Sequence, residues 1–547
     1  MDIRNIAIIA HVDHGKTSLV DCMLRQSGLF RENQDSPDLI MDSNPQERER
    51  GITILAKNCS VRWGDTKINL IDTPGHADFG GEVERVLKMA DSCLLVVDAF
   101  EGPMPQTRYV LSKAFGYHLR PIVVINKIDR PDARPAEVLS EVLELFIDLG
   151  CDEEFLECPV IYSSAKEGFA RKSLDDTNND VAPLLDEIIA SAPPPGGDSS
   201  APVQTLITTL DYSDYVGRIG IGRVFEGTLN VGQKVCLISR DGHRSTETVT
   251  GLFTFDGLKH AASKQAPAGE IVAITGIEEV GIGDTIADLD DPHPLPIVSI
   301  DEPTLTMVFR INDSPFAGRE GKFMTTRHLR DRLEKELRTN VALRVEDLPQ
   351  KDSFRVSGRG LLHLGVLIES MRREGYELLV GKPKVIYREI GGKKCEPIEY
   401  LTVDAPNSAT GAVIELVGGR RGEMIKMEPR ESFTHLEFTI PARGLIGLRT
   451  RMLNATRGEA IMHHTFYEYE HLRGSIPGRA NGAMVSGETG RVTAYAIQNL
   501  TDRGVMFAKP GDEVYRGQLV GEHCKDDDLD VNVCREKKLT NIRAASA

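Results

Sequence analysis

The sequence predicts a multidomain protein of mixed α/β and β class, and three observations support that fold class. The chain has 547 residues, which is too long for one hydrophobic core and corresponds to about three to five domains. Within the first 165 residues, four apolar runs are each followed by a polar, glycine- or serine-containing loop, as in an open α/β sheet. Beyond residue 203 the chain changes to short β-branched runs, and beyond 303 to alternating strand and helix patterns.

The composition is that of an ordinary soluble protein, with 40% hydrophobic and 27% charged residues. No window approaches eighteen uncharged apolar residues, and the N-terminus has no signal-peptide pattern, so we expect a cytoplasmic protein with no membrane partner. The nine cysteines are scattered without a C-x-x-C pair. This spacing argues against a zinc site and fits reduced thiols in the core.

A phosphate-binding loop follows the first predicted strand, Ile6 to Ile9. Residues 10–17 read AHVDHGKT, with Ala10 where the generic motif has Gly, and they lead into a predicted helix. Backbone N–H groups and the helix N-terminus then face the phosphates. Lys16 reaches the outer phosphates, and the Thr17 hydroxyl can bind Mg²⁺. The loop residues expected to contact the nucleotide are Asp13, His14, Gly15, Lys16, Thr17 and Ser18.

Three further motifs follow predicted strands, at the edge where open α/β sheets bind ligands. These strands are Ile68 to Ile71, Pro121 to Ile125 and Val160 to Tyr162. In DTPGH at 72–76, Asp72 is suited to approach the metal through water and the Gly75 N–H to approach the outer phosphate. In NKID at 126–129, the Asp129 carboxylate can accept hydrogen bonds from the ring N–H and exocyclic amine of guanine, a pair that adenine lacks, so GTP is predicted.

The motif SSAK at 163–166 fits the loop that places a backbone N–H on the guanine oxygen. The residues expected to hold the base are Asn126, Lys127, Ile128, Asp129, Ser164 and Ala165. The competing interpretation of each motif is ordinary turn chemistry in a sheet that binds no nucleotide. Four motifs in order at strand ends favour the nucleotide.

The later part of the chain divides into four further predicted units. A Pro- and Gly-rich stretch at 191–202 has the composition of a linker. Two successive βαββαβ patterns follow a predicted β-barrel, the second including a helix at Leu445–Leu453, and the last stretch is predicted to be β-rich. The predicted domains are an α/β P-loop domain at 1–195, a β-barrel at 203–298, ferredoxin-like α+β domains at 303–388 and 394–472, and an incomplete C-terminal domain at 473–547.

These features together resemble a translational GTPase. The resemblance is carried by the P-loop with its Asp-His pair, RERGITI at 48–54, DTPGHADF at 72–79 and the barrel. The two ferredoxin-like domains are similar to the third and fifth domains of elongation factor G, but 387–398 leaves no room for that factor's fourth domain. PARGLIG at 441–447, the segments 474–479 and 481–483, and KLTNIR at 538–543 resemble the TypA/BipA family across essentially the whole chain.

The resemblance implies roles that spacing alone does not show. Thr53 matches the threonine that completes the Mg²⁺ shell, and His76 matches the histidine that positions the attacking water. Val12 and Ile52 match the apolar gate that restrains this histidine until the ribosome reorients it. The alternatives are a merely structural loop histidine for His76, and ordinary packing for the apolar pair.

Family resemblance also implies a function: a monomeric, ribosome-binding GTPase that hydrolyses GTP to GDP and acts in large-subunit assembly and in stress or low-temperature translation. Its implied partners are large-subunit rRNA and A-site tRNA. One alternative is a regulator of RNA or ribosome binding in which GTP is a conformational latch and hydrolysis is incidental. Another is an elongation factor, which the missing fourth domain disfavours.

The charge distribution bears on the expected RNA contacts. The formal net charge is −17, but residues 472–547 hold eleven Lys/Arg against ten Asp/Glu, so the acidic excess lies elsewhere. The residues expected to contact RNA are Arg535, Lys537, Lys538 and Arg543. On charge alone a solvated surface explains this cluster equally well. The family continues into a further basic segment, whereas this chain stops at Ala547, which weakens the expected ribosome contact more than the GTPase prediction.

Overall fold

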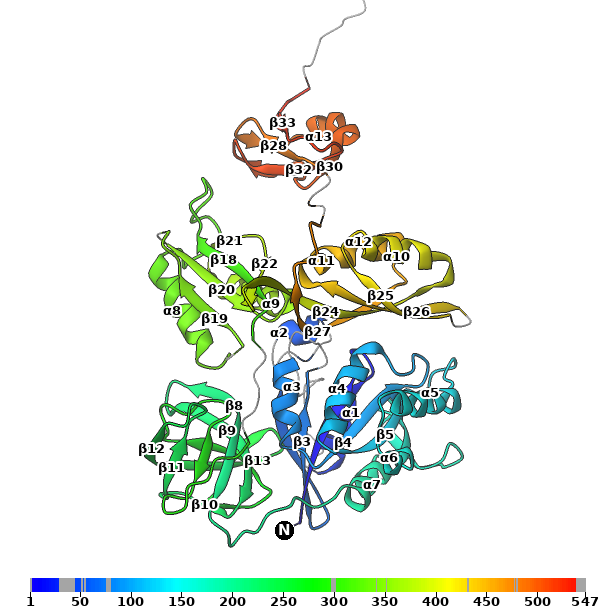
Figure 1. The fold of residues 1–547 in the computed structure, drawn as a ribbon, viewed down its shortest axis with the longest axis vertical. Helices are drawn as coiled ribbons and strands as arrows, with labels where there is room; N and C mark the ends of the chain where they lie inside the picture. Colours follow the sequence, from blue (N-terminus) through cyan, green and yellow to red (C-terminus); the bar gives the residue numbers. More distant parts are fainter. Residues whose placement is uncertain are drawn as a thin grey trace, which may run out of the picture.

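The computed structural model describes residues 2–28, 45–50, 53, 56–74, 80–296, 302–340, 342–350, 352–429, 432–476, 478 and 481–537. Figure 1 shows two lobes side by side at the lower end of the molecule, the N-terminal α/β region and the barrel region. Two α+β regions lie above them, and the C-terminal region lies at the far end of the long axis. Helix α2 lies at the centre, between the N-terminal sheet and the regions above it.

The N-terminal region is a seven-stranded sheet in the order β2-β3-β1-β4-β5-β6-β7. Its inner strands pair in parallel and are buried along nearly their whole length, because helices cover both faces. The four strands predicted ahead of the nucleotide motifs are present. The strands are β1 (Asp2–Ala10), β2 (Lys57–Trp63), β3 (Thr66–Asp72), β4 (Ser92–Asp98), β5 (Arg120–Asn126), β6 (Val160–Ser164) and β7 (Phe169–Arg171). The helices are α1 (Lys16–Gln26), α2 (Pro45–Arg50), α3 (Gly80–Leu87), α4 (Pro105–Gly116), α5 (Pro135–Asp148), α6 (Glu153–Leu156) and α7 (Ala182–Ser191).

The next region is all-β, as predicted, and surrounds its own apolar core. Eight antiparallel strands run in the order β12-β11-β17-β8-β9-β16-β13-β14, and β10 pairs with β15. The strands are β8 (Gln204–Ser213), β9 (Gly217–Glu226), β10 (Thr228–Asn230), β11 (Lys234–Ile238), β12 (Arg244–Thr248), β13 (Gly251–Asp256), β14 (Lys259–Ala262), β15 (Gln265–Pro267), β16 (Ile271–Thr275) and β17 (Thr285–Ala287).

The barrel region is joined to the N-terminal sheet by a buried polar interface. Lys67 Nζ lies 2.8 Å from Glu270 Oε1, with side chains only 5% and 9% exposed. Arg223 Nη2 lies 2.8 Å from Asp91 Oδ1, and Asn5 Nδ2 donates to Asp91 Oδ2 at 3.0 Å. Apolar residues of β9, β13 and β16 belong to the same core cluster as residues of β1, β4 and α3. The two regions therefore behave as one packed unit.

Each of the next two regions is a five-stranded antiparallel sheet with α-helices packed against it, two in the first region and three in the second. The first contains β18 (Leu305–Ile311), α8 (Thr326–Leu337), β19 (Arg344–Asp347), β20 (Ser353–Gly358), α9 (Leu361–Glu374), β21 (Leu378–Val380) and β22 (Lys384–Val385). The second contains β23 (Arg388–Ile390), β24 (Lys393–Pro406), α10 (Thr410–Gly418), β25 (Glu423–Pro429), β26 (Phe433–Pro441), α11 (Ala442–Leu445), α12 (Leu448–Ala455) and β27 (Ile461–His471).

One helix boundary in the second α+β region differs from the prediction. The helix expected at Leu445–Leu453 is α12, which begins at Leu448, and a short additional helix, α11, ends at Leu445. Ile446 is extended, and Gly447 takes a left-handed conformation with a φ of 72°. Glycine adopts that conformation without the steric cost of a Cβ, so the chain turns here and α12 starts in a new direction.

The C-terminal region combines two small sheets with one helix that the β-rich prediction did not include. The Thr493 side chain caps this helix by accepting a hydrogen bond from the Ala496 N–H. The elements are β28 (Ala483–Ser486), β29 (Gly490–Arg491), α13 (Ala494–Leu500), β30 (Gly504–Met506), β31 (Glu513–Val514), β32 (Leu519–His523) and β33 (Leu529–Val531). Among the described residues, none of the helices has both the length and the apolar character needed to span a bilayer.

The buried interface generates a stability prediction. Lys67→Met leaves the Glu270 carboxylate buried without its cation, so the first unfolding transition should lose about 3–5 kcal/mol in denaturant titrations. The matched control is Arg330→Met, which breaks the solvent-exposed pair with Asp347 and should cost at most about 1 kcal/mol. Equal losses in the two variants would contradict the proposed role of the buried pair.

Candidate nucleotide site

The predicted P-loop is a tight turn that ends in helix α1. Gly15 is the N-cap residue of α1 and has a φ of 88°, while Asp13 has a φ of 65°. A Cβ on Gly15 would lie 2.3 Å from Asn126 Nδ2, so the loop requires glycine there for space as well as for conformation. The loop therefore presents its backbone and the positive end of an eleven-residue helix at the carboxyl edge of β1.

Asn126, at the end of β5, links three of the predicted motifs. Its Nδ2 donates to the carbonyl oxygen of His14, 2.9 Å away, in the P-loop. Its Oδ1 accepts hydrogen bonds from Ser163 Oγ at 3.1 Å and from the Ala165 N–H at 3.0 Å. Ser164 lies in the same loop, where its hydroxyl accepts from the Glu167 N–H. One buried side chain thus joins the phosphate loop to the predicted base-binding loop.

The base-recognition motif turns sharply after Asn126. Lys127 has a φ of 63°, and its ammonium lies 2.8 Å from Asp98 Oδ2. The Ile128 N–H donates to the Ser163 carbonyl oxygen, and Asp129 is exposed at the end of the turn. Asp129 is therefore accessible to a ligand.

Asp98 was missed in the sequence analysis although it holds the base-recognition turn in place. It ends β4 and is fully buried. Burial alone would raise the pKa of Asp98, but hydrogen bonds from Lys127 and from the Phe100 and Glu101 N–H groups lower it below its ordinary value. The available signal was a carboxylate at a strand end, in VVDA at 96–99, at the same sheet edge as the other motifs.

The predicted phosphate and metal residues are also brought together. Lys16 Nζ lies 2.7 Å from Asp72 Oδ1 and donates to the Thr73 carbonyl oxygen at 2.5 Å. Thr53 Oγ1 lies 3.4 Å from Asp72 Oδ2. Thr17 follows Lys16 in the first turn of α1 and is half-buried.

This donor set fits a magnesium nucleotide. Thr17 and Thr53 offer hydroxyl oxygens, and Asp72 offers a carboxylate, which are the hard ligands that Mg²⁺ prefers. Lys16 supplies a cation among the same groups, and the glycine cradle at Gly15 keeps the backbone open to phosphate oxygens.

Some predicted residues lie outside the described part of the chain. These residues are Ile52, Gly75, His76, Lys538 and Arg543. Among the others, Val12 is half-buried in the P-loop, while Arg535 and Lys537 lie beyond β33 and are both exposed. The roles assigned to all these residues stay predictions.

Comparisons with known proteins agree with this architecture. Family models match for the elongation factor Tu GTP-binding domain at 1–194, elongation factor Tu domain 2 at 217–287, the elongation factor G C-terminus at 393–480 and the TypA/BipA C-terminal domain at 481–547. A protein of Synechocystis named "Large ribosomal subunit assembly factor BipA" is 55% identical over 100% of this chain and 92% of its own length.

The same printed name is carried by relatives from Bacillus subtilis, 53% identical over 100% of this chain and 89% of theirs, and from Escherichia coli K12, 50% identical over 99% and 90%. The chain belongs to the TypA/BipA family. A crystal structure of a Thermus thermophilus protein shares the fold, with a TM-score of 0.60 at 16% identity over 86% of this chain and 97% of that one. The predicted fold class is confirmed, and membership of this family supports GTPase activity.

The glycine cradle generates a binding prediction with an internal control. Gly15→Ala should weaken GDP binding by at least tenfold, because its Cβ would displace the Asn126 amide from the His14 carbonyl oxygen. Gly28→Ala carries similar backbone strain, with a φ of 78°, but its Cβ meets nothing within 4 Å. Titration with a fluorescent GDP analogue measures both affinities. A similar loss of affinity in the two variants would show that strain, not the clash, is responsible.

Proposed function

We propose that this protein is a GTPase that the ribosome stimulates and that acts in assembly of the large ribosomal subunit. The observation that carries the proposal is the meeting of four nucleotide motifs at one sheet edge, next to helix α2, which contacts another domain. Relatives that match nearly the whole chain are named for large-subunit assembly. Stress or low-temperature translation belongs to the same proposal, and rests on the family resemblance.

Helix α2 supports a coupling between nucleotide and domain arrangement. This helix ends at Arg50, three residues before Thr53, and overlaps the motif RERGITI at 48–54. Gln46 Nε2 donates to Ser370 Oγ at 2.8 Å and to the Val366 carbonyl oxygen at 3.3 Å, both on α9. Arg373 of α9 donates to Glu49 at 2.9 Å. A change at Thr53 can therefore be transmitted to the first ferredoxin-like domain through α2.

Helix α3 supports the same coupling from the other side of the site. It starts at Gly80, eight residues after Asp72, and its Glu82 side chain accepts a hydrogen bond of 3.4 Å from the Ala56 N–H. Burial raises the pKa of Glu82, although the neighbouring Arg85 opposes the rise. The helix after the DTPGH motif thus contacts the segment that follows Thr53.

The chain's own residues divide the chemistry of hydrolysis among them. Lys16 would bind the outer phosphates, and the N-terminus of α1 would hold them in place by electrostatic attraction. Mg²⁺, held by Thr17, Thr53 and, through water, Asp72, would neutralise charge on the β- and γ-phosphates. His76 would position the attacking water, with Val12 and Ile52 as its gate, and Asp129 would select guanine.

An external activator is part of the proposal because positioning and charge stabilisation by a partner accelerate related GTPases by about 10⁵-fold, or about 7 kcal/mol. Ribosomal RNA beside His76 would supply that stabilisation. Arg535 and Lys537, with Lys538 and Arg543, would contact rRNA and A-site tRNA through phosphates. Such contacts make binding strongly dependent on salt.

Steady-state GTP turnover with and without ribosomes tests the proposed function. Wild-type protein should show a large increase with ribosomes, and His76→Ala should lose at least a hundredfold of that increase while its GTP affinity is retained. Equal rates in all four assays would refute the proposal. Full growth complementation by His76→Ala would instead favour the alternative in which GTP is a latch.

The α2–α9 contact has a separate test. Gln46→Ala and Ser370→Ala should each reduce ribosome-stimulated turnover several-fold and leave basal turnover unchanged, because the contact lies away from the phosphates. If Ser370 acts only through its hydrogen bond with Gln46, the double variant should lose no more than Gln46→Ala alone. Additive losses, or a loss of basal turnover, would contradict this coupling route.

A further inference from the structure

A cavity of about 750 Å³ lies where three regions of the chain meet, away from the predicted nucleotide site. Helices α3 and α4 of the N-terminal region form one wall, the start of α9 forms a second, and β27 with α12 of the second ferredoxin-like region forms a third. Its volume is that of a typical small-molecule site. None of the predicted nucleotide-contacting residues is among those that line it.

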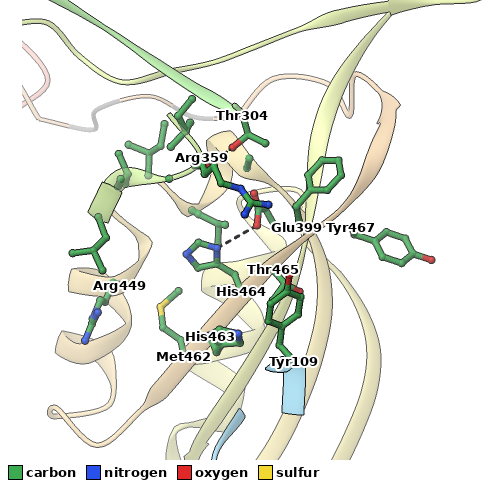
Figure 2. A pocket seen from close by; sticks show the side chains of 18 of the residues that line it. Tyr109, Thr304, Arg359, Glu399, Arg449, Met462, His463, His464, Thr465 and Tyr467 are labelled. Atoms are coloured by element: carbon green, nitrogen blue, oxygen red, sulfur yellow. Dashed lines mark hydrogen bonds and ion pairs between the residues drawn. The ribbon is translucent and has the colours of Figure 1, made fainter. Parts of the chain in front are cut away.

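Flat side chains from all three regions converge on this cavity (Figure 2). The Tyr109 ring extends from α4, the Arg359 guanidinium comes from the segment before α9, and His463 and His464 lie on β27. Burial and the Glu84 carboxylate raise the pKa of Tyr109 to about 12, so its hydroxyl stays neutral. Aromatic rings and guanidinium planes are the groups on which nucleobases stack.

The charge of the lining favours an anion. Two of its cations are paired, because Lys113 lies 2.6 Å from Glu84 and Arg388 contacts Glu302; His464 Nδ1 lies 3.3 Å from Glu399. By formal charge the described lining residues hold four cations against three carboxylates: Lys113, Arg359, Arg388 and the exposed Arg449 against Glu84, Glu302 and Glu399.

The N-terminus of α9 adds a positive partial charge from the backbone. Gly360 is the N-cap of this fourteen-residue helix, and its position offers no side-chain cap. Gly360, Leu361 and Leu362 all line the cavity, so the positive end of the helix dipole faces it.

We propose that this cavity binds a nucleotide-sized aromatic anion, a base with an attached phosphate, stacked among Tyr109, Arg359 and the β27 histidines. The phosphate lies towards Arg449 and the start of α9. The ligand is either a free nucleotide or one nucleotide of an RNA strand, which share this chemistry. Because the walls come from three regions, the occupant holds them in one arrangement. This site is distinct from the proposed GTPase site.

Equilibrium dialysis with labelled AMP tests the proposal on full-length protein saturated with GDP and Mg²⁺. GDP fills the guanine site, and adenine lacks the donor pair expected for that site, so AMP reports on the cavity. Wild-type protein should bind one AMP per chain saturably below millimolar concentration. Adenosine and ribose 5-phosphate should each bind at least tenfold more weakly, since adenosine lacks the phosphate and ribose 5-phosphate lacks the base.

Two variants with matched controls locate the bound AMP. His464→Gln removes a ring that lies beside Glu399, and Arg449→Gln removes the exposed cation; each should weaken AMP binding about tenfold. The controls are His293→Gln, a histidine paired with Asp291 in the barrel region, and Arg457→Gln, just beyond α12. Both controls should bind AMP within twofold of wild type. Unchanged thermal midpoints show that the variants are folded.

The results distinguish an RNA strand from a free nucleotide and show whether the cavity binds either one. Stronger binding of a hexameric oligoadenylate than of AMP, with the same variant effects, supports an RNA strand as the source. Stronger binding of AMP supports a free nucleotide. Absence of saturable AMP and oligoadenylate binding, or equal affinities in Arg449→Gln and Arg457→Gln, overturns the proposal. Neither result alters the turnover assays that test the GTPase function.

Discussion

The arrangement of the whole molecule depends on the buried polar interface between the N-terminal sheet and the barrel. Two ion pairs, Lys67–Glu270 and Arg223–Asp91, are taken out of water there. Burying charge is costly unless each group is paired and its remaining hydrogen bonds are satisfied, so such an interface tolerates one docking geometry. Asn5 meets this requirement by donating to both Asp91 and the Gly269 carbonyl oxygen.

Because the barrel is held against the N-terminal sheet, a nucleotide at the proposed site would act on the position of the two α+β regions. Their described contacts with the N-terminal region include α2 on α9 and α4 on β27. The first contact belongs to the segment before Thr53, and the wall around the three-region cavity includes α3, which follows the DTPGH motif. The segments that we propose to respond to nucleotide thus meet the α+β regions at their shared junction.

The arrangement of the candidate nucleotide site follows largely from the sequence because that site is built from local signals. Each motif directly follows an apolar strand, and the carboxyl ends of parallel strands lie at one edge of the sheet. Identifying the strands is therefore enough to predict that Lys16, Asp72 and Asn126 lie close together. The linking role of Asn126 did not follow from the pattern, because it depends on a 2.9 Å approach to a carbonyl oxygen 112 residues away. Domain boundaries drawn from the sequence remain predictions.

The cavity between the three regions could not be predicted from sequence patterns, because it also depends on contacts between distant parts of the chain. The sequence pattern places Tyr109 in an amphipathic helix and His463 and His464 in a strand, with no sign that they share a cavity. Only the packing of three separate regions places them around one cavity. The start of α12 was predicted at Leu445 instead of Leu448, because the apolar pattern does not show the left-handed backbone of Gly447 from which the helix begins.

The Lys16–Asp72 pair shows how a buried site can exchange partners with little net electrostatic cost. Both side chains are more than 90% buried, and each currently neutralises the other. A phosphate would take the place of the carboxylate beside Lys16, and a hydrated Mg²⁺ would take the place of the ammonium beside Asp72. The Lys16 ammonium and the Asp72 carboxylate would each keep an oppositely charged partner. Neither would therefore be buried as an unpaired charge, which is energetically costly. Removing Lys16 alone would break this balance, since Asp72 would then repel the phosphates it sits beside.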